Sequence, residues 1–115
     1  MEGLYEVLYM DRYVYFETSS IDITKPHPSR KLLEGLKGCC SGVTICPNFE
    51  YGQPGIHEDQ EGFFVFEGTG FLKMDSEEIP VKPDTAILLP PGVAHTFKRN
   101  PDSVPLKLFW FHAAV

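Results

Sequence analysis

Basic residues are scarce in this sequence and nowhere gather into a cluster. The chain has 115 residues, with 10 lysines and arginines against 16 acidic residues, which gives a formal net charge of −6. Its longest basic runs are the pairs Arg30-Lys31 and Lys98-Arg99. Nucleic acid and anionic membrane surfaces are held by basic patches. We therefore expect neither nucleic acid nor a membrane among its partners.

Cysteines and long apolar runs are also few. The three cysteines, Cys39, Cys40 and Cys46, are odd in number and include an adjacent pair, which makes a poor disulfide framework. We expect them to be buried structural thiols in a reducing compartment. No apolar stretch is long enough to span a bilayer, and residues 1–10 lack the basic region that begins a signal peptide. The sequence thus predicts a cytoplasmic protein.

The composition favours one β-rich domain. Apolar residues make up 43% of the chain and aromatic residues 13%, which is enough to bury a core at this length. Aromatic side chains fit pleated sheet surfaces well. We expect a single domain over residues 1–115, with an N-terminal arm at 1–38 and the core motifs at 42–111.

Short apolar runs separated by Gly and Pro turns predict the strands. The expected strands are 43–46, 63–66, 71–74, 85–89, 94–98 and 106–111. Residues 75–78 are expected to form a polar turn. Residues 30–36 are compatible with a helical turn or an edge strand, and the runs 4–10 and 13–16 with strands or a packing arm. Regularly spaced short strands indicate a sandwich or a barrel.

Two stretches, residues 57–68 and 84–95, resemble the two motifs of the cupin family. The first family motif reads G-x5-H-x-H-x3,4-E-x6-G, and the second reads G-x5-P-x-G-x2-H-x3-N. The positions that match are His57, Glu61 and Gly68 in the first, and Pro90, Gly92 and His95 in the second. The resemblance implies an all-β fold, the cupin double-stranded β-helix or jelly-roll barrel of two antiparallel sheets, with an N-terminal arm.

The sequence departs from the family pattern at several positions. Gly55 stands where the first histidine is expected, Asp84 where a glycine is expected, and Arg99 where an asparagine is expected. In an alternative alignment, His57 would take the place of the first histidine and Asp59 that of the second. This alignment fails, because no carboxylate then follows Asp59 at the spacing that the motif requires. The family's usual four-ligand metal set is therefore short of one histidine.

The resemblance implies that His57, Glu61 and His95 hold a divalent metal. Two imidazoles and one carboxylate can occupy one face of an octahedral ion and leave positions open for water, oxygen or substrate. Iron, manganese, nickel and zinc all suit this set. The family implies a metalloenzyme of the isomerase, epimerase or oxygenase type acting on a small polar metabolite. The alternative is a non-catalytic cupin with a vestigial metal site that binds a sugar or small acid.

Four further residues are candidates for the wall of the pocket. Phe63 and Phe97 follow Glu61 and His95 by two positions, so they share a strand face with these ligands. Asp59 could supply another ligand or lie at a polar edge, and His112 could act as an acid or base or be a surface residue. Outward-facing phenylalanines on the same strands predict a homodimer.

Overall fold

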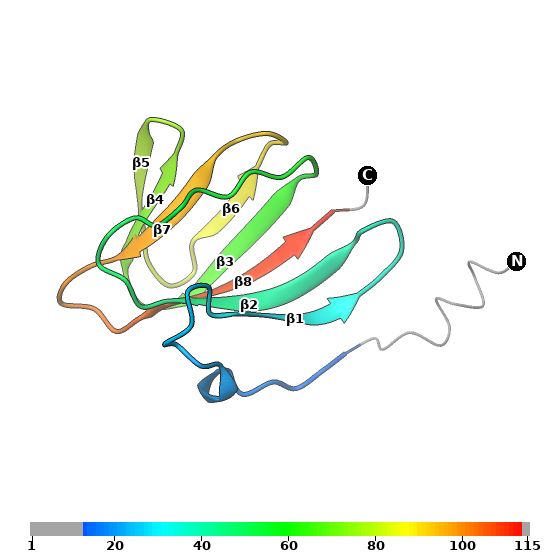
Figure 1. Ribbon diagram of the computed structural model, residues 1–115, viewed down its shortest axis with the longest axis horizontal. Helices are drawn as coiled ribbons and strands as arrows, with labels where there is room; N and C mark the ends of the chain where they lie inside the picture. The colour runs from blue at the N-terminus through cyan, green and yellow to red at the C-terminus, as the bar shows by residue number, and fades with distance from the viewer. Residues whose placement is uncertain (1–12, 114–115) are drawn as a thin grey trace, which may run out of the picture.

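The fold consists of two antiparallel β-sheets (Figure 1). The structure is a computed structural model that describes residues 13–113. The five-stranded sheet has the order β1-β2-β8-β3-β6 and the three-stranded sheet the order β5-β4-β7. The strands are β1 (Ser29–Glu34), β2 (Cys40–Cys46), β3 (Glu61–Glu67), β4 (Gly70–Met74), β5 (Glu77–Val81), β6 (Ala86–Leu89), β7 (His95–Arg99) and β8 (Leu106–His112). This confirms the expected all-β class of two antiparallel sheets, although the sheets are not closed into a barrel.

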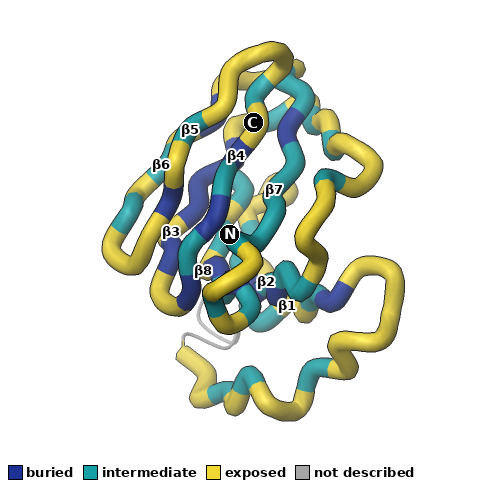
Figure 2. The backbone as a smooth tube through the Cα atoms, turned by 90° about the vertical axis from the view of Figure 1, so that its left-hand side faces the viewer, coloured by how far each residue is buried: buried dark blue, intermediate teal, exposed yellow. Residues whose placement is uncertain are grey.

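The core lies between the two sheets, because apolar side chains at every second position along the strands point toward the opposite sheet. On β3, Phe63 and Val65 are buried, whereas Phe64 and Phe66 are exposed. On β8, Leu108 is buried in the same way. The core cluster draws on both sheets, and its buried members are Phe63, Val65, Leu72, Val81, Leu89, Leu106 and Leu108 (Figure 2).

Most of the predicted strands are present, with ends that differ by a few residues. Residues 30–36, left open between a helical turn and a strand, contribute the edge strand β1. Within the arm assigned to 1–38, β1 thus pairs with β2 as part of the larger sheet.

The prediction of a polar turn over 75–78 was wrong at its C-terminal half. Asp75 turns with a φ of 51°, and β5 already begins at Glu77. Pro80 is compatible with β5, because β5 is an edge strand, where Pro80 needs no N–H for a second neighbour.

The segment before β1 contains little regular structure. Residues 13–16 form neither a strand nor a helix, and a single 3-10 turn, η1 (Thr18–Ser20), follows them. The apolar run 4–10 lies outside the described residues. Within residues 13–113, no helix is long and apolar enough to cross a membrane.

The cysteines are free, but they are less buried than expected. Cys39 is exposed, because it lies in the turn between β1 and β2, where its N–H bonds to Leu36 O. Cys40 and Cys46 are half-buried on β2. Burial raises the pKa of the Cys46 thiol, which holds it in the protonated form.

Candidate metal centre

The candidate site forms where the ends of three strands and one loop meet. Glu61 is the first residue of β3, His95 the first of β7, and His112 the last of β8. Because β3 and β8 are antiparallel, their register places Glu61 directly beside His112. His57 lies on the loop that leads into β3. Because β3 and β8 belong to the five-stranded sheet and β7 to the three-stranded sheet, both sheets contribute to the site.

The Glu61 carboxylate lies at the centre of this group. It is 5% exposed, and the neighbouring His95 is 9% exposed. His95 Nε2 lies 2.8 Å from Glu61 Oε1, and His112 Nε2 lies 2.5 Å from Glu61 Oε2. His57 Nε2 is 3.6 Å from the same Oε2. Three imidazole nitrogens therefore converge on one buried carboxylate.

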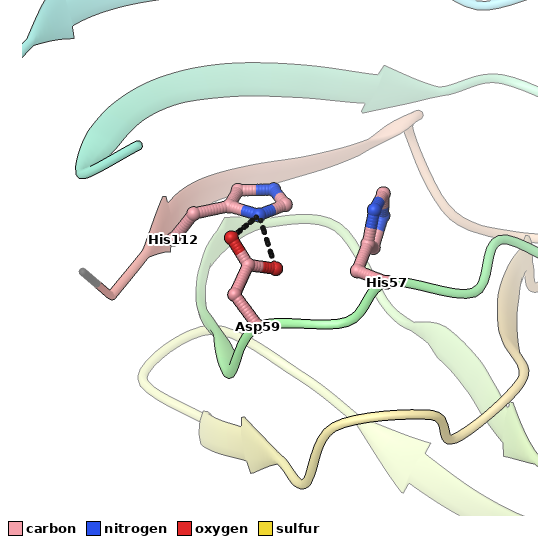
Figure 3. A group of neighbouring side chains, drawn as sticks. All are labelled: His57, Asp59 and His112. Carbon is pink, nitrogen blue, oxygen red and sulfur yellow. Dashed lines mark hydrogen bonds and ion pairs between the residues drawn. The ribbon is translucent and has the colours of Figure 1, made fainter. Parts of the chain in front are cut away.

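The second nitrogen of two of these rings fixes where their protons lie. His95 Nδ1 is 3.1 Å from Val93 O, and a carbonyl can only accept, so Nδ1 donates. His112 Nδ1 lies 3.0 Å from each oxygen of Asp59 and donates in the same way (Figure 3). In the neutral rings, both Nε2 atoms then carry lone pairs that face the Glu61 carboxylate.

Imidazole lone pairs and a carboxylate repel each other, so their close approach is stable only with a positive charge between them. Glu61 Oε1 is buried and accepts no hydrogen bond of good geometry, although His95 Nε2 is only 2.8 Å away. Burial lowers the pKa of His95, but its contacts with Glu61 and Val93 and the charge of Glu61 outweigh that effect and raise the pKa overall. The surroundings of Glu61 thus favour a cation, which can be a proton or a metal ion.

The donor atoms fit a divalent metal. Ligand atoms from His57, Glu61 and His95 all lie within 4.8 Å of one another. Neighbouring ligands bound at about 2.1 Å from an ion such as zinc lie about 3.0 to 3.4 Å apart, between the His95–Glu61 distance of 2.8 Å and the His57–Glu61 distance of 3.6 Å. The buried oxygen without a hydrogen bond is the atom that a metal would satisfy.

A cavity of about 670 Å³ opens beside this group. Phe63 and Phe97 lie on its wall and pack edge to face, with ring centroids 5.1 Å apart. Trp110 and His112 from β8 continue the wall. Neither lysine nor arginine occurs among the described residues that line it.

The structure brings the three predicted ligands together and places the other candidates around them. Phe63, Phe97 and His112 line the cavity, whereas Asp59 lies behind His112 and is hydrogen-bonded to it. Sequence reasoning missed His27, which was expected to be an ordinary loop residue but lies on the cavity wall. Nothing in its Pro-His-Pro context indicated a position near the site.

Gly55 lies against two of the candidate metal ligands, His57 and His95, as its place in the first motif implied. It pairs with His95 through two backbone hydrogen bonds, of 2.9 and 3.0 Å. A Cβ atom at this position would lie 3.5 Å from His95 Nε2 and 3.7 Å from His57 Nε2. A side chain at position 55 would therefore enter the metal site.

Comparison with known proteins assigns the family. The family model described as a cupin domain matches residues 43–112. The chain belongs to the cupin domain family. All four groups around the site, from His57 to His112, fall within the matched range.

Similar solved structures agree with this cupin fold. The cupin domain of Schizosaccharomyces pombe Cnp3 has a TM-score of 0.75 and 16% identity, covering 90% of this chain and 76% of that one. A Cupin 2 conserved barrel domain protein from Salinispora arenicola has a TM-score of 0.69 and 13% identity, covering 89% and 87%. Salicylate 1,2-dioxygenase from Pseudoaminobacter salicylatoxidans, in adducts with gentisate, has a TM-score of 0.68 and 14% identity, covering 80% and 26%. No curated protein sequence matches the chain.

Proposed function

We propose that this cupin, a single domain over residues 1–115, holds a divalent metal with His57, Glu61 and His95 and presents it to a small polar metabolite in the cavity. The observation that carries the proposal is the buried Glu61 carboxylate, which faces imidazole lone pairs and has one oxygen without a hydrogen bond. Burying such a charge is costly unless a cation compensates it. Iron, manganese, nickel and zinc all suit the donor set.

The surroundings of the site support chemistry on a bound metabolite. When bound, the metal supplies Lewis acidity and open positions, as isomerases, epimerases and oxygenases require. Phe63 and Phe97 exclude water from one side of the cavity. His112 and Asp59 hold a proton at His112 Nδ1, at the edge of the site.

The charge of the cavity narrows the class of metabolite. No described lining residue is a lysine or arginine, so a phosphate or a second carboxylate would find no cationic side chain there. Hydroxyl and amide groups from Ser29, Thr44 and Gln53 line it instead. These groups favour an uncharged polyol or carbonyl compound, or an acid that binds through the metal itself.

A second candidate function is a non-catalytic cupin that binds a sugar or small acid. It is favoured by Gly55, which removes one histidine of the family's ligand set. In that case a proton occupies the space between His95 and Glu61, in line with the raised pKa of His95.

The cytoplasmic location stays a prediction from the cysteine pattern.

Metal content separates the two candidates. The protein is purified without chelators or metal-affinity resin, and its metals are measured for the wild type, His57→Ala, His95→Ala and the control His27→Ala. His27 lies on the cavity wall but outside the ligand group, so the control tests the loss of a cavity histidine alone. We expect about one metal per chain in the wild type and the control, and none in the two ligand variants. A metal-free wild type that still binds a sugar would contradict the metal proposal and support the binder.

A further inference from the structure

We infer that His112 is a fourth protein ligand of the metal, held in place by Asp59, and that it restores the ligand count which Gly55 reduces. The inference rests on the proposed metal-binding function. It assigns a ligand from the last strand, β8, which neither cupin motif includes.

The position of His112 is set by the sheet. Its strand is hydrogen-bonded to β3, and Glu61 and His112 are directly paired in that ladder. Adjacent side chains in an antiparallel pair lie on the same face, so both point toward the cavity. The result is the 2.5 Å approach of His112 Nε2 to Glu61 Oε2, while the His57 ring lies with its centroid 4.7 Å from that of His112.

Asp59 determines which nitrogen of His112 faces the metal. Both Asp59 oxygens lie 3.0 Å from Nδ1, so this nitrogen carries the proton and Nε2 is free to bind (Figure 3). A carboxylate that accepts the second N–H of a ligand histidine fixes its tautomer and increases its basicity. Both side chains are largely shielded from solvent, with 15% of His112 and 19% of Asp59 exposed.

Asp59 is itself a less suitable ligand for the ion beside Glu61. Asp59 and His112 both group with His57 and not with Glu61 and His95, but of these two only His112 contacts Glu61, at 2.5 Å from Nε2 to Oε2. The two Asp59 oxygens are also engaged by the Nδ1 proton of His112. We therefore assign Asp59 as a positioning residue and His112 as the ligand.

His112 approaches the group from a different direction than a histidine at position 55 would. The atoms nearest to a Cβ at Gly55 belong to His95 and His57, and His112 is not among them. Gly55 itself lies on the cavity wall. His57, Glu61, His95 and His112 would thus hold the metal, with the cavity beside them for a metabolite.

The test measures the affinity of metal-free protein for Co²⁺ by competition with a chromophoric chelator, together with the visible absorption spectrum of the bound Co²⁺. The variants are His112→Ala, Asp59→Asn, His57→Ala and the control His27→Ala, each checked for folding by circular dichroism without metal. We expect His112→Ala to weaken Co²⁺ binding at least tenfold and to change the spectrum, because a ligand is lost. Asp59→Asn should weaken binding by about 10- to 100-fold with the same spectral type, since only the support of the ligand changes.

A rescue variant gives the assignment a second, independent measurement. Gly55→His combined with His112→Ala returns the family's own histidine, and the contacts of a Cβ at position 55 are of ordinary van der Waals length. If His112→Ala weakens Co²⁺ binding because a ligand is missing, the double variant should recover the Co²⁺ affinity. If His112→Ala binds Co²⁺ with wild-type affinity and spectrum while His57→Ala does not, the assignment of His112 is wrong but the metal function stands. If the wild type binds no Co²⁺, both fail together.

Discussion

At the scale of single residues, backbone conformation accounts for one departure from the second cupin motif. Asp84 stands where the second cupin motif has glycine, and its φ of 74° lies in the left-handed region. Aspartate tolerates this conformation better than most residues, because its short side chain can bond locally. Asp84 can therefore form the same turn before β6 that a glycine would form.

Gly70 shows the opposite case, a glycine that no other residue can replace easily. A Cβ at this position would lie 2.0 Å from Lys98 O on the neighbouring strand β7. Gly70→Ala must push β4 away from β7, so we expect it to lower the free energy of unfolding by about 1–3 kcal/mol. Chemical denaturation monitored by circular dichroism measures this loss.

Gly52 supplies the matched control for that substitution. A Cβ there meets nothing within 4 Å, and its backbone lies outside the left-handed region. Gly52→Ala should change stability by less than about 0.5 kcal/mol. Equal stability of the two variants would show that β4 and β7 can separate without cost.

At the scale of elements, β8 connects the core to the candidate metal site. It lies between β2 and β3, and its alternation sends Leu106, Leu108, Trp110 and His112 toward the interior. The first two of these residues belong to the buried core, and the last two line the cavity. Damage to the strand should therefore affect stability and the site together.

Leu108→Ala tests this role of β8. The side chain is 1% exposed, so its loss leaves a cavity that the two sheets cannot fill, and we expect a destabilisation of about 2–5 kcal/mol. Leu88→Ala on the edge strand β6 is the control, since Leu88 is 61% exposed and should cost less than about 0.5 kcal/mol. Urea denaturation compares the two, and a Leu108→Ala protein as stable as the control would contradict a core position for β8.

The strands were predictable where the chain alternates locally, and not where distant segments meet. The apolar alternation around Phe63 and Leu108 was visible in the sequence and is confirmed by their burial. The β3–β8 register is a non-local property, so the sequence left His112 open between a pocket residue and a surface residue and did not show that it pairs with Glu61. The same reason explains why His27, far from both motifs, was not recognised on the cavity wall.

At the scale of the whole molecule, the outer face of the five-stranded sheet carries exposed aromatic side chains. Phe64 and Phe109 are cross-strand neighbours on this face, at 40% and 38% exposure, with Phe66 and Phe111 beside them. Contiguous aromatic surface on a monomer commonly marks an interaction site. The expected homodimer through this face stays a prediction.

Light scattering coupled to size-exclusion chromatography tests the homodimer. We expect the mass of two chains for the wild type and of one chain for Phe64→Glu combined with Phe109→Glu, because buried carboxylates at such a face would be unpaired. Tyr15→Glu is the control, since Tyr15 is 86% exposed in the segment before η1. A wild type that elutes as a single chain at all concentrations would remove the prediction.

The cavity wall includes Pro26, His27, Pro28 and Ser29, which precede the stretch matched by the cupin family model. The Ser29 hydroxyl is hydrogen-bonded to Thr44 and to the Trp110 indole, so this segment is held to the five-stranded sheet. Part of the cavity wall thus comes from a segment that lies outside the matched stretch, whereas His57, Glu61 and His95 lie inside it. We expect a chimera that carries the residues of another cupin at positions 26–28 to keep His57, Glu61 and His95 in place while the ligand that it prefers changes.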